Sequence, residues 1–274
     1  SAKNVVAIFT ALTSPAKKPF CDFNGDGRAD LAGVTSAGGI YYTTDLSRWN
    51  NIPGVLSRLV AGDLNGDGRT DLAGVTSAGG IYYTTDLSRW NNIPGVLNRL
   101  VVGDLNGDGR ADLAGVTSAG GIYYTTDLSR WNNIPGVLNR LVAGDLNGDG
   151  RMDLAGVTSA GGIYYTTDLS RWNNIPGVLS RLVAGDLNGD GRMDLAGVTS
   201  AGGIYYTTDL SRWNNIPGVL SRLVAGDLNG DGRTDLAGVT SAGGIYYTTD
   251  LSRWNNIPGV LSRLVAGDLN GDGR

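Results

Sequence analysis

The sequence consists almost entirely of one 41-residue unit repeated six times in succession. A seventh copy starts at Asp268, and the copies differ at only a few positions. A unit of this length buries too little apolar surface alone, so repeats of this kind stack on their neighbours to form arrays. The six complete copies occupy residues 22–62, 63–103, 104–144, 145–185, 186–226 and 227–267.

Each unit has the pattern of short strands separated by turns. No stretch carries a helical stripe of useful length. In the second copy, glycine, asparagine, aspartate and proline mark turns at residues 63–71, 77–80 and 91–95. Between and beside these turns, apolar or β-branched runs of strand length lie at residues 59–61, 72–76, 81–85 and 87–91.

Four short antiparallel strands in about 40 residues are typical of one β-propeller blade. We therefore predict an all-β fold, a single propeller domain over residues 1–274, with a solenoid as the competing array. We expect seven blade positions: six complete repeats, and one closed by the terminal segments 1–21 and 268–274. Both termini contain strand-like runs, at residues 5–12 and 263–268. Six blades is the alternative.

Composition narrows the possible functions. All 26 acidic residues are aspartate, the net charge is −4, and no basic stripe is present, so we expect no nucleic-acid partner. With neither histidine nor glutamate in the chain, the usual general bases are missing, so we expect no enzyme activity. No apolar run is long enough for membrane insertion, and the first residues do not read as a signal peptide. We predict that the only cysteine, Cys21, is a buried core residue.

The loop D-x-N-x-D-G-x-x-D carries the clearest chemistry in the unit. Three carboxylates, one amide and the backbone carbonyl at the seventh position are hard oxygen ligands, which suit Ca²⁺ better than Zn²⁺. The loop is not an EF-hand, because Gly74 stands where that motif needs glutamate. The alternative is a tight turn without metal. The predicted metal ligands are Asp22, Asn24, Asp26, Arg28, Asp30; Asp63, Asn65, Asp67, Arg69, Asp71; Asp104, Asn106, Asp108, Arg110, Asp112; Asp145, Asn147, Asp149, Arg151, Asp153; Asp186, Asn188, Asp190, Arg192, Asp194; Asp227, Asn229, Asp231, Arg233, Asp235; and Asp268, Asn270, Asp272.

This loop between two short strands resembles the FG-GAP or VCBS-type repeat of calcium-binding propellers. The Gly-Gly-Ile-Tyr-Tyr strand that follows, together with the opening segment 5–12, resembles the PVL-type fungal propeller lectins. The first resemblance implies about one structural calcium ion per blade. The second implies a secreted or extracellular protein that binds N-acetylglucosamine-type sugars.

A tryptophan followed by two asparagines is the candidate sugar site. Aromatic faces stack on pyranose rings, and amides both donate and accept hydrogen bonds. We expect this site at the end of the blade opposite the calcium loop, beside residues 77–80. Packing between blades is the alternative role for the tryptophans. In each tyrosine pair, such as Tyr82 and Tyr83, we expect one side chain in a core and the other exposed. The candidate ligand residues are Trp49, Asn50, Asn51, Trp90, Asn91, Asn92, Trp131, Asn132, Asn133, Trp172, Asn173, Asn174, Trp213, Asn214, Asn215, Trp254, Asn255 and Asn256.

These features lead to two functional hypotheses. The first is a calcium-stabilised multivalent lectin whose partners are glycans or glycoproteins, because linked weak sites gain avidity. The second is a protein-interaction or structural scaffold that binds no sugar. Near-identical copies indicate recent amplification or deliberate symmetrisation, and an incomplete blade offers a route to self-association.

Overall fold

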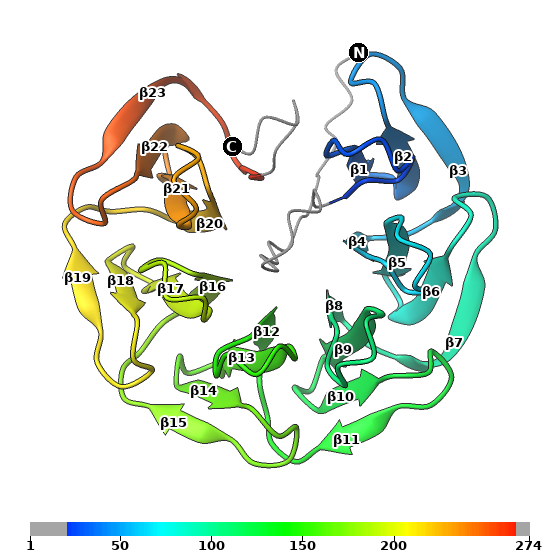
Figure 1. Ribbon diagram of the computed structural model, residues 1–274, viewed down its shortest axis with the longest axis horizontal. Helices are drawn as coiled ribbons and strands as arrows, with labels where there is room; N and C mark the ends of the chain where they lie inside the picture. Colours follow the sequence, from blue (N-terminus) through cyan, green and yellow to red (C-terminus); the bar gives the residue numbers. More distant parts are fainter. Residues whose placement is uncertain (1–20, 267–274) are drawn as a thin grey trace. The chain divides into compact units, whose positions relative to one another are not determined.

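The computed structural model describes residues 21–266, which form six antiparallel sheets (Figure 1). We number these sheets as blades 1 to 6 in chain order. Strands follow one another in sequence order across each sheet, and five of the six sheets have four strands. The prediction of an all-β propeller with four-stranded antiparallel blades is confirmed.

The 23 strands of the described residues recur at nearly the same positions of every repeat. Blade 1 contains β1 (Leu31–Val34), β2 (Gly39–Thr43) and β3 (Asn50–Val55); blade 2 contains β4 (Arg58–Gly62), β5 (Asp71–Val75), β6 (Gly80–Thr84) and β7 (Asn91–Val96); and blade 3 contains β8 (Arg99–Gly103), β9 (Asp112–Val116), β10 (Ile122–Thr125) and β11 (Asn132–Ile134). Blade 4 contains β12 (Arg140–Gly144), β13 (Asp153–Val157), β14 (Ile163–Thr166) and β15 (Asn173–Ile175); blade 5 contains β16 (Arg181–Gly185), β17 (Asp194–Val198), β18 (Ile204–Thr207) and β19 (Asn214–Ile216); and blade 6 contains β20 (Arg222–Gly226), β21 (Asp235–Val239), β22 (Gly244–Thr248) and β23 (Asn255–Val260).

The described residues divide into two compact units, with blades 1–3 in residues 21–137 and blades 4–6 in residues 138–266. The first strand of a blade packs against the first strand of the next blade in its unit, as β12 does against β16 and β16 against β20. We call these first strands the inner strands. The last strand of each blade lies at an edge of its sheet, and we call it the outer strand.

Each four-stranded sheet takes its strands from two repeats. The inner strand β4 comes from the end of repeat 22–62, whereas β5 to β7 come from repeat 63–103. Six aspartate loops therefore produce six blades, which matches the six-blade alternative and not the seven positions that we expected. Residues 263–266, assigned above to a seventh blade, form no strand, and the remaining terminal residues lie outside those described.

The fourth strand of each blade differs from the prediction. In blade 2 it is β7 (Asn91–Val96), while residues 87–91, the predicted strand, belong mostly to the preceding loop. Proline is tolerated in β7 because an outer strand has one edge without a neighbour. The pairing of β6 with β7 also shifts register between Gly80 and Ile81.

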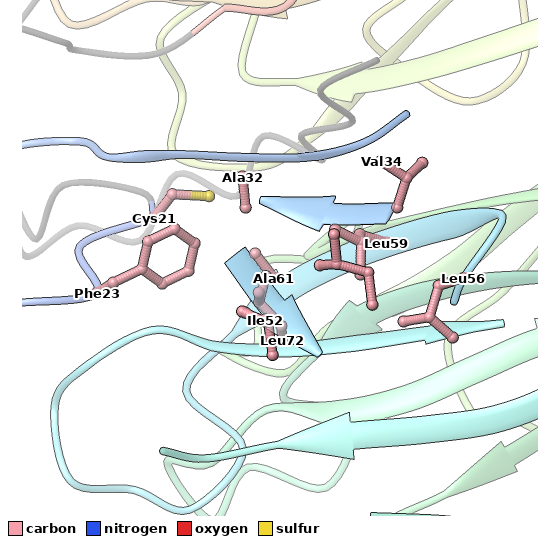
Figure 2. Packing of buried hydrophobic residues seen from close by; sticks show 10 residues of the cluster. Cys21, Phe23, Ala32, Val34, Ile52, Leu56, Leu59, Ala61 and Leu72 are labelled. Atoms are coloured by element: carbon pink, nitrogen blue, oxygen red, sulfur yellow. The ribbon is translucent and has the colours of Figure 1, made fainter. Parts of the chain in front are cut away.

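The core of each blade lies between sheets and is formed by the apolar positions of all four strands. In blade 2, Leu72, Ile81 and Ile93 are at most 1% exposed. Figure 2 shows one such cluster in the first unit, where Cys21 and Phe23 pack with residues of blades 1 and 2. Cys21 is buried, as predicted, and burial raises the pKa of its thiol well above the usual value. Among residues 21–266, no helix has the length and hydropathy needed to cross a membrane.

Candidate functional site

The two ends of a blade carry different loops, because the strands alternate in direction. In blade 2, residues 63–70 and 85–90 lie at one end, which we call the aspartate end. Residues 76–79 and the link 97–98 lie at the other, which we call the arginine end because Arg58 begins the inner strand there. The predicted calcium loop is therefore at the aspartate end.

The carboxylates of the predicted calcium loop accept hydrogen bonds from the backbone of the same loop. The Asp63 carboxylate accepts N–H bonds from Gly66 at 2.7 Å, Asp67 at 3.1 Å and Gly68 at 2.8 Å. The Asp67 carboxylate accepts the N–H of Arg69 at 2.8 Å. These side chains close the loop in the way that aspartate closes turns in general.

The last aspartate of the loop is buried in the blade. Asp71 is 2% exposed, and its Oδ2 accepts the N–H groups of Leu64 at 2.9 Å and Asn65 at 3.1 Å. Burial, and to a smaller extent the nearby Asp67 and Asp63 charges, raise its pKa to about 7. Burial likewise raises the pKa of Asp30 to about 6 and the pKa values of Asp112, Asp153 and Asp194 to about 7. The pKa of Asp235 is also raised by burial.

The loop therefore gathers the donor atoms that a calcium ion would need, although its own amides already engage them. Carboxylate and amide oxygens are suitable ligands for Ca²⁺. Within residues 21–266, however, the aspartates do not form a cluster of three groups that converge on one metal position. The predicted ligands Asp268, Asn270 and Asp272 lie outside the described residues.

The second loop of the aspartate end is also built around an aspartate. The Asp86 carboxylate accepts the N–H groups of Ser88 and Arg89 and the hydroxyl of Thr84 at 3.0 Å. These bonds, the backbone bond from Arg89 above all, hold the pKa of Asp86 well below its usual range. Leu87 adopts a φ of 54°, which is uncommon for leucine, and its side chain packs against the core. This turn explains why residues 87–91 are not a strand.

The tryptophans lie at the aspartate end, so the expectation that they lie at the opposite end is wrong. Four of them, Trp90, Trp131, Trp213 and Trp254, pack against the preceding blade of their own unit. The indoles cover a glycine of the neighbouring outer strand: a Cβ added at Gly54 would lie 3.2 Å from Nε1 of Trp90, and one at Gly95 would lie 3.1 Å from Nε1 of Trp131. The second unit repeats this contact at Gly177 with Trp213. Among the described residues, the Nε1 atoms of five tryptophans are buried without a hydrogen-bond partner: Trp90, Trp131, Trp172, Trp213 and Trp254. Trp49 is 42% exposed.

The two asparagines after each tryptophan differ in role. The second one supports the sheet, since Nδ2 of Asn92 donates to the Ile81 carbonyl at 3.1 Å. The first one, Asn91, is exposed at the start of the outer strand. The supporting bond recurs at Asn51, Asn133, Asn174, Asn215 and Asn256, while the exposed position recurs at Asn50, Asn132, Asn173, Asn214 and Asn255.

Both tyrosines of a pair are half-buried, which differs from the expectation that one is exposed. Tyr82 packs against the cluster shared with blade 1, whereas Tyr83 packs against the cluster shared with blade 3. Adjacent strand residues face opposite sides, so each tyrosine fills a different contact between blades.

Sequence reasoning missed the inner-strand arginines as a group. Arg181 begins β16 and Arg222 begins β20, and both are half-buried at the arginine end. The available signal was an arginine that recurs once per repeat outside the two aspartate-containing loops. The arginines of the aspartate end, such as Arg89, are exposed.

Comparisons with known proteins agree with this architecture. The Tectonin domain family model matches residues 24–186, 66–227 and 106–270. None of the curated proteins compared with the sequence matches it. The FG-GAP or VCBS and PVL-type likenesses stay predictions.

The solved structures similar in fold have little sequence in common with the chain. BBS1N, in a crystal of its complex with ARL6DN, has 13% identity and a TM-score of 0.68, with 95% of this chain and 89% of that chain covered. PorZ of Porphyromonas gingivalis, described as a component of the type-IX secretion system, has 14% identity and a TM-score of 0.57, with coverages of 89% and 35%. The Dos1 propeller has 9% identity and a TM-score of 0.55, with coverages of 90% and 69%. These identities support a shared fold only.

Proposed function

Because the chain belongs to the Tectonin domain family, a β-propeller family of lectin type, we propose that it is a non-catalytic, multivalent carbohydrate-binding protein. The observation that carries this proposal is the exposed first asparagine of each outer strand, such as Asn91, beside a tryptophan anchored between blades. This pair recurs once per blade on a rigid sheet. Its ligands are extracellular glycans or glycoproteins, with N-acetylglucosamine-type sugars as the first class to test.

The anchored tryptophan has a limited part in this site. Its buried Nε1 is not available to a sugar hydroxyl, so it contributes the exposed part of its ring, while Asn91 supplies the hydrogen bonds. Each such site is shallow and weak. Several sites on one chain bind a multivalent glycan roughly 100 to 10,000-fold more tightly than one site does.

We propose that calcium stabilises the aspartate end. The supporting features are the oxygen donors of each loop and the buried Asp71, whose pKa is raised by burial and, to a smaller extent, by the neighbouring Asp67 and Asp63 charges. A calcium ion would compete with the loop amides for the oxygens of Asp63 and Asp67, and would neutralise the loop.

The sugar proposal is tested on a glycan array with a variant in which the six exposed asparagines, at positions 50, 91, 132, 173, 214 and 255, are changed to alanine. The matched control changes five exposed serines of the arginine end to alanine, at positions 36, 77, 118, 159 and 200, and leaves Ser241 in place because it lines a separate pocket. We expect the first variant to lose glycan binding and the control to keep it. If folded, calcium-loaded protein binds no glycan, the scaffold hypothesis replaces this one.

The calcium proposal is tested separately by titrating calcium into chelator-stripped protein and following thermal unfolding. We expect calcium to raise the melting temperature and Asp194→Asn to reduce the stoichiometry by one. Asp209→Asn, an exposed aspartate outside the calcium loop, should leave the stoichiometry unchanged. Absence of binding would mean that the loops are turns closed by hydrogen bonds alone.

A further inference from the structure

Charge is separated along the blades of the second unit. The twelve aspartates of residues 138–266 all lie at the aspartate end, together with six arginines. The described ion pairs of this unit, Arg151 with Asp149 and Arg233 with Asp231, lie at that end too. The arginine end of the same residues carries four arginines and no acidic residue: Arg140, Arg181, Arg222 and Arg263.

These four arginines are close enough to repel one another. The inner strands β12, β16 and β20 pack side by side, and each begins with one of the arginines. Burial, together with the charges of Arg140, Arg222 and Arg263, lowers the pKa of Arg181 to about 10. Arg181 still carries its charge at neutral pH, so the free protein holds like charges together at a cost that a bound anion would remove.

A pocket of about 440 Å³ opens beside two of these arginines. Arg181 and Arg222 line it, together with hydroxyl-bearing residues of the turn 240–243 and of the links before and after blade 6. Four of these residues carry hydroxyl groups, namely Ser221, Thr240, Ser241 and Ser262, and the volume is in the range of small-molecule sites.

The turn that forms one wall of the pocket is well ordered by its own hydrogen bonds. Gly243 donates to the Thr240 carbonyl at 3.0 Å and Gly244 donates to the Thr240 hydroxyl at 3.0 Å. Leu261 donates to the Gly243 carbonyl at 2.9 Å, which joins the turn to the link after β23. The pocket wall is therefore preorganised.

We propose that this pocket binds an oxyanion, the carboxylate, sulfate or phosphate group of a small acidic ligand. A guanidinium donates two parallel hydrogen bonds to such a group, and hydroxyls supply further donors. No carboxylate of residues 138–266 lies at this end to compete for the arginines. The pocket is larger than an inorganic oxyanion, so it has room for the body of a sugar that carries the charge. The pocket shares no residue with the glycan site proposed above, so the two proposals are tested independently.

Sodium sulfate is the first probe, compared with sodium chloride at equal ionic strength by calorimetry and thermal unfolding. We expect sulfate to bind and to raise the melting temperature, and chloride to do neither. The variant Arg181→Gln/Arg222→Gln should bind at least one sulfate fewer per chain. Without sulfate it should melt no lower than the parent protein, because the substitutions relieve charge repulsion. The control Arg171→Gln/Arg212→Gln, with exposed arginines of the aspartate end, should bind sulfate as the parent does.

Because the repeats carry the same arginine, a second variant replaces all six, at positions 58, 99, 140, 181, 222 and 263, by glutamine. It should lose sulfate binding, whereas the equivalent change at positions 48, 89, 130, 171, 212 and 253 should not. If the sixfold variant does not fold, the double variant decides. Equal stabilisation by sulfate and chloride, or undiminished sulfate binding by the double variant, would overturn the proposal.

Parallel titrations with a sulfated monosaccharide, a sugar phosphate and a uronic acid identify the source of the anion. Tighter binding than that of inorganic sulfate assigns the anion to a sugar, and equal binding assigns it to a free ion.

Discussion

The two ends of each blade turn the chain by different chemistry. At the aspartate end of blade 5, the side chains of Asp186 and Asp194 accept backbone N–H groups. At the arginine end, the turn 199–202 is closed by a backbone bond from Gly202 to the Thr199 carbonyl, and glycines allow close approach of the strands. The stability of the loops at the aspartate end therefore depends on charge and on any bound cation, whereas the stability of the turns at the arginine end depends on close steric fit.

The largest expected effect is steric and falls near the arginine end. Gly197→Ala places a Cβ against the carbonyl oxygen of Arg181 and 2.7 Å from Cδ1 of Leu179. Such overpacking between two strands should lower the free energy of unfolding by ~3 kcal/mol, measured by denaturant titration. In the control, Gly203→Ala, the new Cβ meets only the ends of Tyr205 and Thr199 side chains at 3.3 and 3.4 Å. A similar loss of stability in both variants would contradict the close approach of Gly197 to the carbonyl oxygen of Arg181.

The next effect belongs to the aspartate end. Asp194→Ala removes the acceptor of the buried Leu187 N–H, which should cost ~2 kcal/mol in calcium-free protein. Asp194→Asn keeps an acceptor oxygen, so its loss of stability should be less than half as large. Equal losses for the two variants would show that the negative charge, and not the hydrogen bond, stabilises the loop.

The pH dependence separates the two kinds of aspartate at this end. Asp71, Asp112 and Asp194 have pKa values of about 7 when folded, above the unfolded value, so the folded state gains stability as pH falls from 8 through 7 towards 4. Asp86 and Asp209 have lowered pKa values, so their contribution is present above about pH 4 and is lost in stronger acid.

Chelator-stripped protein should therefore melt about 5 °C higher near pH 5 than at pH 8, and lower again near pH 2.5. A melting temperature that rises steadily from pH 5 to pH 8 would contradict the raised pKa values.

The smallest effect is expected for the exposed ion pairs of the aspartate end. The Arg151 and Asp149 side chains are 3.0 Å apart, and more than half of the Arg151 side chain is exposed. Arg151→Gln should change the free energy of unfolding by ~0.3 kcal/mol, and less at high salt. A loss above 1 kcal/mol at high salt would show that this arginine has a further structural role.

The sequence predicted the strands best where apolar runs are bounded by clear turn residues. The runs 59–61, 72–76 and 81–85 correspond to β4, β5 and β6, because short apolar or β-branched runs bounded by turn residues can be recognised as strands. The outer strand β7 was missed, because asparagine, proline and glycine are turn formers that an edge strand tolerates. Leu87 led to the opposite error: as an apolar residue it favoured a strand over residues 87–91, but it lies in a turn that Asp86 closes.

The candidate sites divide in the same way. The aspartate loop is contiguous, so its donor atoms were evident from spacing alone. The arginine pocket draws Arg181 and Arg222 from different blades, and residues 41 positions apart come together only when inner strands pack. The blade number was missed for a related reason: each four-stranded sheet takes its strands from two repeats.

The proline within the outer strands β3, β7 and β23 has a consequence for solubility. A chain that repeats the same edge strand in every blade presents unpaired backbone groups several times over, and each such edge is a template for pairing with another molecule and for aggregation. Pro94 removes one donor from this edge, and the register shift beside Ile81 distorts the pairing of β7. The residue that made β7 hard to recognise from the sequence therefore also protects the protein from polymerising through that strand.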